Sequence, residues 1–265
     1  MASQAEGKRQ KVIDIRHLWA GYDGQMVLQD VNLSLHALDF VGLVGPNGGG
    51  KTTLLRVILG LLAPSRGEVR IMGQSVSQGR THVGYVPQSI EVDHDFPASV
   101  WEVVRMGRLG ARRLLQRFTA ADEAAVEAAL RNVHLLDLAG RPIGDLSGGQ
   151  RKRVYIARAL ATEPSILLLD EPMAGIDPQV SSSMYRLLSR LNERVTILMV
   201  THDMSAISAH VKTVGCLNRQ LFYHREKRIT PEMMAAGYGC PIDLIAHGVP
   251  HRVFAEHSAE EGRHL

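Results

Sequence analysis

The chain has 265 residues, of which 45% are hydrophobic and 22% are charged, and its formal net charge is +3. This is enough apolar material for a packed core in one large domain or two smaller ones, and so small a net charge gives no reason to expect a nucleic-acid partner. Two cysteines cannot build a disulfide framework, which favours a reducing compartment. The first twelve residues lack the apolar core of a secretory signal, and no apolar run approaches the length of about 18 residues that crosses a bilayer. We therefore expect the chain to be soluble by itself and to meet a membrane only through a partner.

The N-terminal third of the chain is patterned as strands that lead into a helix. The expected elements, in chain order, are strands at 12–18 and 27–35 with a turn at 21–24 between them, a buried strand at 40–45, a helix at 51–62, and short strands at 68–73 and 82–87. The strands alternate in polarity or are wholly apolar, whereas the helix has apolar residues at helical spacing.

A helix-like block, rich in alanine and leucine, interrupts this pattern from about residue 97 to residue 160. Alternation then resumes with a strand at 165–172, a helix at 178–192, a strand at 195–203 and a strand at 211–218. Wholly apolar strands that alternate with helices predict an α/β fold, with a mostly parallel sheet covered on both faces. We add an antiparallel β part from the N-terminal strands, with the helical block as an inserted subdomain.

The domain organisation expected from these patterns is simple. Residues 1–230 form one domain that contains the inserted helical subdomain, and residues 231–265 form a C-terminal extension. The histidines of this extension are His247, His251, His257 and His264. Gly248 and Pro250 break any helix that would align the first two, so we expect a flexible, solvated tail and not a metal site.

A glycine-rich loop follows the buried strand at 40–45 and fits the pattern G-x-x-x-x-G-K-[ST]. Its residues are Gly45, Pro46, Asn47, Gly48, Gly49, Gly50, Lys51 and Thr52. Glycines allow backbone N–H groups to wrap phosphates without a Cβ clash. Lys51 suits the β- and γ-phosphates, and the Thr52 hydroxyl suits Mg²⁺; we count the next residue, Thr53, with the same binding set. The strand before the loop and the helix after it make this pattern specific.

An apolar strand ends in two carboxylates, Asp170 and Glu171. Ligands of open α/β sheets gather beyond the carboxyl ends of the strands. Since successive side chains of an extended chain point in opposite directions, we expect the two acids to have different tasks. Asp170 suits the Mg²⁺ shell, and Glu171 suits the activation of a water molecule for attack on the γ-phosphate.

A second potential anion site lies about a hundred residues beyond the phosphate loop. Residues 145–154 read DLSGGQRKRV, in which small polar residues precede an apolar periodic run. This order predicts the start of a helix, and a helix start offers free N–H groups and partial positive charge to an anion.

Together the phosphate loop, LSGGQ at 146–150 and LLLDEP at 167–172 resemble the ATP-binding cassette (ABC) ATPases over residues 12–220. The resemblance implies a P-loop NTPase core that binds ATP and Mg²⁺ and hydrolyses ATP. It also implies that Tyr22 stacks on adenine, that Gln88 senses Mg²⁺ and the attacking water, and that His202 contacts the γ-phosphate.

The resemblance further implies that two identical chains pair head to tail. Ser147, Gly148 and Gly149 of one copy, with Gln150 in the same nucleotide-binding set, would then cap the γ-phosphate bound by Lys51 of the other copy. The sequence pattern agrees, because a second anion cradle is useful if it arrives from another chain when ATP is bound.

The segment 92–110, VDHDFPASVWEVVRMGRLG, is similar to zinc and manganese uptake cassettes. This resemblance implies an ATPase subunit at the cytoplasmic side of the membrane, held there by an integral membrane permease. An extracytoplasmic metal-binding protein would belong to the same system. The alternatives are the cassette of an iron-chelate or cobalamin importer, or a soluble ABC ATPase in cofactor assembly.

Overall fold

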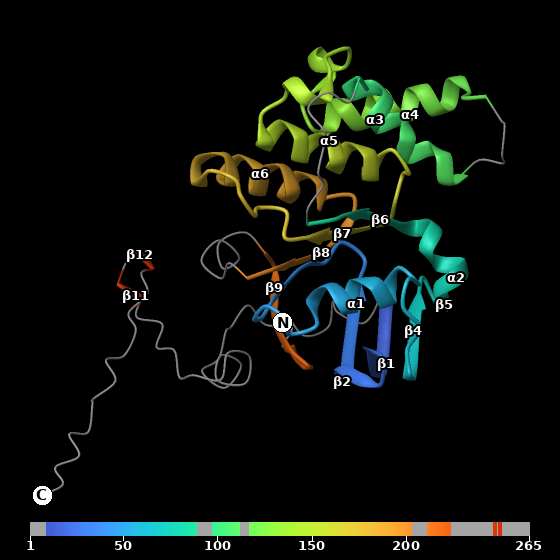
Figure 1. The fold of residues 1–265 in the computed structure, drawn as a ribbon, viewed down its shortest axis with the longest axis vertical. Helices are drawn as coiled ribbons and strands as arrows, with labels where there is room; N and C mark the ends of the chain where they lie inside the picture. Colours follow the sequence, from blue (N-terminus) through green and yellow to red (C-terminus); the bar gives the residue numbers. More distant parts are fainter. Residues whose placement is uncertain are drawn as a thin grey trace, which may run out of the picture.

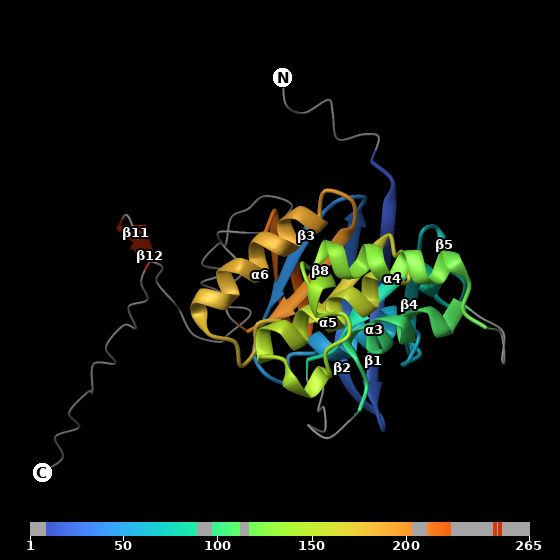
Figure 2. The ribbon, with the colours of Figure 1, turned by 90° about the horizontal axis from the view of Figure 1, so that it is seen from above.

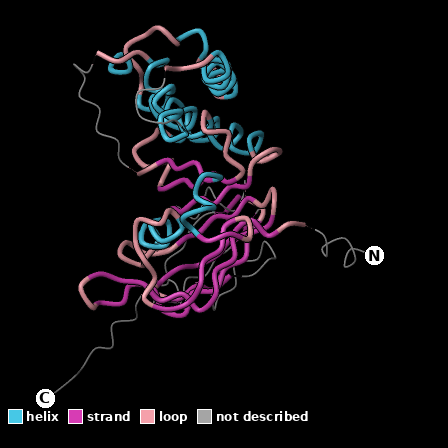
Figure 3. Tube along the Cα trace, turned by 90° about the vertical axis from the view of Figure 1, so that its right-hand side faces the viewer, coloured by secondary structure: helices cyan, strands magenta, loops and turns pink. Residues whose placement is uncertain are grey.

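The structure is a computed structural model that describes residues 9–88, 97–111, 117–202, 211–223, 246–247 and 249–250. Helices gather at one end of the molecule and strands at the other, as Figure 3 shows. The middle of the molecule combines both, because helices pack against a central sheet.

The central sheet has six strands. In spatial order they are β10 (Gln220–Tyr223), β9 (Thr213–Asn218), β3 (Phe40–Val44), β8 (Thr196–Thr201), β7 (Ile166–Asp170) and β6 (Val83–Val86). The five strands from β9 to β6 run parallel, and only the edge strand β10 is antiparallel to its neighbour. The predicted α/β fold with a mostly parallel sheet is therefore confirmed.

A second sheet is antiparallel throughout. Its strands, in spatial order, are β2 (Gln25–His36), β1 (Lys11–Tyr22), β4 (Arg66–Ile71) and β5 (Gln74–Ser75). The strands β1 and β2 are longer than predicted, because they join in a tight hairpin in which Tyr22 pairs with Gln25. This sheet is the predicted antiparallel β part.

The helices lie on both faces of the central sheet and at one end of the molecule (Figure 1). The helices are α1 (Lys51–Ile58), α2 (Val76–Gly79), α3 (Val100–Arg105), α4 (Ala120–Asn132), α5 (Gly148–Leu160) and α6 (Pro178–Leu191), with short 3₁₀ segments at Arg80–His82, Met106–Ala111, Leu136–Leu138 and Ile143–Asp145. In the sequence, helices α3, α4 and α5 come between β6 and β7, and in space they pack against one another. Seen from above, α5 and α6 lie over one face of the central sheet (Figure 2). None of the described helices combines the length and apolar character needed to cross a bilayer.

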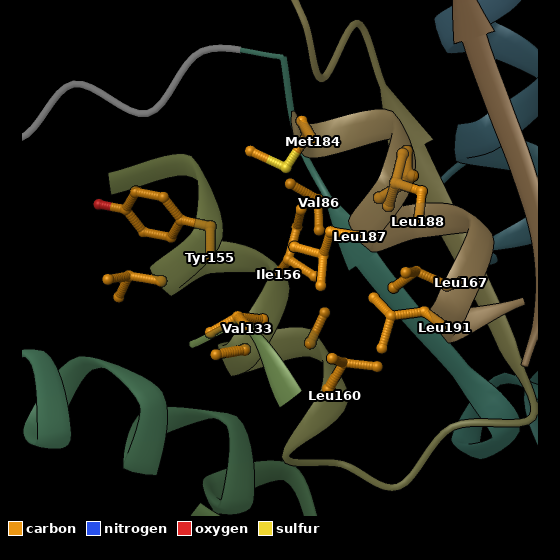
Figure 4. Packing of buried hydrophobic residues seen from close by; sticks show 14 of the residues in the cluster. Val86, Val133, Tyr155, Ile156, Leu160, Leu167, Met184, Leu187, Leu188 and Leu191 are labelled. Carbon is orange, nitrogen blue, oxygen red and sulfur yellow. The ribbon is translucent and has the colours of Figure 1, made fainter. Parts of the chain in front are cut away.

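The central sheet separates two hydrophobic cores, which explains why its strands are wholly apolar. Leu167 and Leu169 of β7 pack in one core with α5 and α6, as the labelled side chains around Leu167 show in Figure 4. Ile166 and Leu168 of the same strand point to the other core, which contains α1 and the antiparallel sheet. Helix α1 is therefore held between two sheets, and its first residue faces the edge where the parallel strands end.

The predicted helix at 51–62 is too long at its C-terminal end. The helix α1 ends at Ile58, because Gly60 adopts a left-handed φ of 71°. The Gly60 N–H donates to the Val57 carbonyl at 3.0 Å, and the Leu61 N–H donates to the Arg56 carbonyl at 2.8 Å. This is a Schellman motif, which ends helices at a glycine.

One predicted segment lies largely, and another partly, outside the described residues. Of the extension at 231–265, the structure describes only the paired strands β11 (Ala246–His247) and β12 (Val249–Pro250). Residues 92–96 of the segment 92–110 are likewise not described.

Candidate active site

The candidate site lies along one edge of the central sheet, where four neighbouring parallel strands end. The glycine loop follows β3, His202 follows β8, Glu171 follows β7, and Gln88 follows β6. Ligands of open α/β sheets bind at this edge. Strand order alone therefore brings together groups that are up to 157 residues apart in the sequence, from Gly45 to His202.

The glycine loop has little room for side chains. A Cβ atom on Gly45 would lie 2.0 Å from the carbonyl oxygen of Leu217 in the adjacent strand β9. Gly50 has a left-handed φ of 98° and is the N-cap of α1. Within the described range 9–88, no side chain caps the first turn of α1 and no acidic residue lies in it. Its N–H groups therefore remain available for an anion.

Lys51 is a buried cation at the start of α1. Its Nζ donates to the carbonyl oxygens of Gly45 at 2.9 Å and Pro46 at 3.0 Å, and it lies 3.8 Å from Glu171 Oε1. Burial lowers the pKa of Lys51, while the negative charges of Glu171 and Asp170 oppose this shift. The lysine thus bridges the glycine loop and the acidic pair.

Asp170 is a buried carboxylate at the end of β7. It accepts one long hydrogen bond from Thr52 Oγ1 and another from the hydroxyl of Tyr85, each at 3.4 Å. Burial raises the pKa of Asp170, and the neighbouring charge of Glu171 adds to the rise. A buried carboxylate held by two long bonds, beside a threonine hydroxyl, offers the hard oxygen ligands that Mg²⁺ takes. The residues present therefore fit the ion.

Tyr85 was not among the predicted site residues. Burial and the nearby Asp170 raise the pKa of its phenol to about 12, so it stays protonated and can donate. Its position in β6, directly beside β7, gives it this contact. A tyrosine in a short strand carries no sequence signal for such a role.

The backbone of Glu171 does not have the extended conformation that the sequence predicted. The strand β7 ends at Asp170, and Glu171 has a left-handed φ of 48°, so the alternation of an extended chain does not apply to the pair. The two acids nevertheless have different partners. His202 Nδ1 lies 2.6 Å from Glu171 Oε2, and a carboxylate acceptor favours the tautomer with the proton on Nδ1.

An open cleft of about 450 Å³ lies beside the glycine loop, and Asp170 and His202 contact it only through their partners Thr52 and Glu171. It is lined by Val27, Asn47, Gly48, Gly50, Lys51, Thr52, Thr53, Gln88 and Glu171. Apart from Val27, all of these were predicted from the sequence. The structure thus gathers the phosphate loop, the glutamine after β6 and the glutamate after β7 around one space.

The residues of LSGGQ are not part of this lining, and neither is Tyr22. Ser147 is the exposed N-cap of α5, where its Oγ accepts from the Gln150 N–H at 3.3 Å and its own N–H donates to Gln150 Oε1 at 3.0 Å. The predicted helix start is therefore confirmed. Tyr22 is exposed at the end of β1, and its hydroxyl accepts from Arg56 at 3.0 Å.

A glycine loop between a buried strand and a helix, a buried lysine, and carboxylates at a neighbouring strand end define a nucleotide-hydrolysing domain of the phosphate-loop class. Residues 28–174 match the ABC transporter family, and the chain belongs to that family. It is an ATPase with a nucleotide-binding site, as the resemblance implied.

Two relatives match most of the chain. The zinc uptake system ATP-binding protein ZurA of Listeria innocua is 37% identical over 218 residues, which cover 80% of this chain and 85% of the relative. The manganese transport system ATP-binding protein MntB of Bacillus subtilis is 38% identical over 230 residues, which cover 86% and 92%.

Solved structures show the same fold. A transporter described as of the metal-chelate type, in an inward-facing conformation, has a TM-score of 0.80 at 28% identity, with coverage of 92% of this chain and 97% of the other. An ATP-binding cassette in a dimeric post-hydrolysis state with ADP and Pi has a TM-score of 0.69 at 26% identity, with coverage of 82% and 100%.

Proposed function

We propose that this ATPase energises the uptake of a divalent metal, zinc or manganese, through a separate membrane permease. The observation that carries the ATP-dependent part is that Lys51 and Glu171 line one cleft with the glycine loop, while His202 is paired with Glu171. The zinc and manganese relatives support the choice of cargo. The chain would then lie peripherally at the cytoplasmic side of the membrane, in a system with an extracytoplasmic metal-binding protein.

We assign the phosphates of ATP to the glycine loop, the first turn of α1 and Lys51. Thr52, Asp170 and Gln88 would hold Mg²⁺, which neutralises charge on the phosphates when it is bound. Lys51 would exchange its bonds to the Gly45 and Pro46 carbonyls for bonds to phosphate oxygens. Tyr22, at the rim of the β1–β2 hairpin, would stack on the adenine.

Glu171 is assigned as the general base for the attacking water. Its Oε2 atom is paired with His202, whereas Oε1 points towards Lys51 at 3.8 Å. We therefore assign Oε1 to accept the proton of the water. His202, which follows β8, fixes the carboxylate through Nδ1, and we assign its other ring nitrogen to contact the γ-phosphate.

The clasp on the γ-phosphate would come from a second copy of the chain. Ser147 and Gly148 are exposed, and they are absent from the cleft lining of their own chain. The α5 N-terminus that they form is suited to an anion. A head-to-tail pair would place this N-terminus of each chain over the nucleotide of the other. A cassette that shares the fold is dimeric with ADP and Pi bound, which supports a two-chain arrangement.

We assign the permease contact to an apolar hollow of about 350 Å³ at α3 and the 3₁₀ segment after it. Its lining is Pro97, Ala98, Glu102, Arg105, Met106, Leu109 and Phe118. Met106 and Leu109 are 41% and 57% exposed and line the same hollow, so they form a contiguous exposed apolar surface. A short amphipathic helix of the permease could bury both.

The double substitution Met106→Glu and Leu109→Glu should abolish co-purification with the permease, because it places two charges in the contact. ATP binding by the isolated chain should be unchanged. The matched control is Leu61→Glu, since Leu61 is 70% exposed in the turn that follows α1 and does not line this hollow. Undiminished co-purification of the double variant would contradict the assigned surface.

Metal uptake by cells tests the proposed cargo. Cells that lack this chain should lose most high-affinity uptake of radioactive zinc or manganese, and the wild-type chain should restore it while Glu171→Gln should not. Ferric chelate and cobalamin should be measured in parallel, because the metal-chelate transporter shares the fold. Loss of chelate uptake with normal zinc and manganese uptake would contradict the proposal, and normal uptake of all four would favour a role in assembly.

A further inference from the structure

Lys152, two residues beyond LSGGQ, makes a contact that the assigned machinery does not use. It lies in the first half of α5 and is half-buried. Its Nζ donates to the carbonyl oxygen of Ala174 at 2.5 Å. A charged donor forms the stronger class of hydrogen bond. Lys152 does not line the nucleotide cleft, so its role cannot be direct contact with ATP bound in its own chain.

The acceptor of this bond belongs to the turn that holds Glu171. The Glu171 N–H donates to the Val200 carbonyl at 2.9 Å, and the Ala174 N–H closes a turn on the Glu171 carbonyl at 3.0 Å. Burial lowers the pKa of Lys152, and the charge of Glu171 opposes this shift. The lysine thus connects α5 to the backbone that carries the general base.

Neighbouring residues fix α5 to the segment that follows the same turn. Arg153 donates to Ser183 Oγ at 2.8 Å, and a Cβ atom on Gly149 would lie 2.7 Å from Val180 Cγ1. Both partners belong to the first part of α6. A displacement of the α5 N-terminus is therefore transmitted to α6 and, through Lys152, to Ala174 in the turn after Glu171, because closely packed interfaces transmit strain.

We propose that Lys152 is a positioning residue that couples the N-terminus of α5 to Glu171 of the same chain. This inference rests on the proposed two-chain site. In that site, α5 of one chain clasps the nucleotide of its partner, while Glu171 of the same chain serves its own nucleotide. Nucleotide bound at one site then sets the orientation of the base at the other, and ATP hydrolysis is cooperative.

The test compares Lys152→Gln, Lys152→Arg and Lys212→Gln in the full chain with its permease. Lys212 is the matched control, because its Nζ also donates to a backbone carbonyl, that of Leu38 at 2.9 Å, but it is exposed. Lys152→Gln should lower kcat about 10-fold, which corresponds to part of one charged hydrogen bond. The Hill coefficient for ATP should fall towards 1, with KM changed less than about 2-fold because the cleft is intact.

Lys152→Arg should recover most of kcat and of the cooperativity, since it keeps the charge and N–H donors, and Lys212→Gln should match the wild type. The proposal would be overturned if Lys152→Gln had the same kcat and Hill coefficient as the wild type. It would also be overturned if the wild-type chain itself had a Hill coefficient of 1. An equal loss of kcat in both Lys152 variants with a lowered Tm would also overturn it, because that is a folding effect. Glu171→Gln is measured in the same assay. If Glu171→Gln keeps full turnover, the proposed function fails. If Glu171→Gln is inactive while Lys152→Gln behaves like the wild type, only the proposed role of Lys152 fails.

Discussion

Replacement of Glu171 by glutamine should reduce ATP turnover by about 10²–10⁴-fold, the usual contribution of a general base. Glutamine keeps the size of the side chain and can still accept from His202, but it cannot take a proton from water. Nucleotide affinity should change little, because the glycine loop and Lys51, to which we assign the phosphates, are unchanged. Phosphate release at saturating MgATP measures the first effect, and binding of a fluorescent ATP analogue measures the second.

Glu193→Gln is the matched control, since Glu193 is an exposed glutamate in the turn after α6. It should turn over ATP at the wild-type rate. Turnover of Glu171→Gln within about 3-fold of the wild type would show that another group accepts the proton, because general-base catalysis contributes far more than this factor.

Replacement of Lys51 by alanine should weaken MgATP binding by about 10–100-fold, which corresponds to one lost charged hydrogen bond. The effect has a second source, because the buried Asp170 and Glu171 lose their nearby positive charge. Like charges repel more strongly in a low-dielectric site, and added phosphates bring further negative charge. Calorimetric titration with MgATP measures the loss.

The unfolding temperature of Lys51→Ala, measured without nucleotide, shows whether the substitution lowers the stability of the fold as well as the affinity for MgATP. Lys212→Ala is the control, since it removes a lysine bonded to a carbonyl at an exposed position. Wild-type affinity in Lys51→Ala would mean that the cleft beside α1 is not the phosphate site.

Much of the site could be predicted because its parts are continuous in sequence and their order follows from sheet topology. The loop from Gly45 to Thr52 and the acids after β7 are short motifs, and parallel strands place their ends together. The strand β7 could also be predicted, because both of its faces are buried and its residues are therefore apolar. The family resemblance supplied His202 and Gln88, which periodicity alone does not distinguish from other polar residues at strand ends.

The parts that were missed depend on backbone conformation or on contacts between distant segments. The left-handed φ of Glu171 is not encoded by a glycine, so an extended strand was the natural expectation. The early end of α1 at Gly60 depends on a Schellman motif, although the glycine itself was visible. Tyr85 and Lys152 gain their roles only through neighbours that are 85 and 22 residues away.

The central claim is that one nucleotide is held between two chains, the glycine loop of one and the α5 N-terminus of the other. Sedimentation equilibrium of the Glu171→Gln chain tests it most directly, because slow hydrolysis preserves bound ATP. With MgATP the mass should be twice that of one chain, and with ADP, or after the added substitution Gly148→Asp, it should be that of one chain. A Glu171→Gln chain that binds MgATP and yet remains a monomer, also in the presence of its permease, would contradict the account.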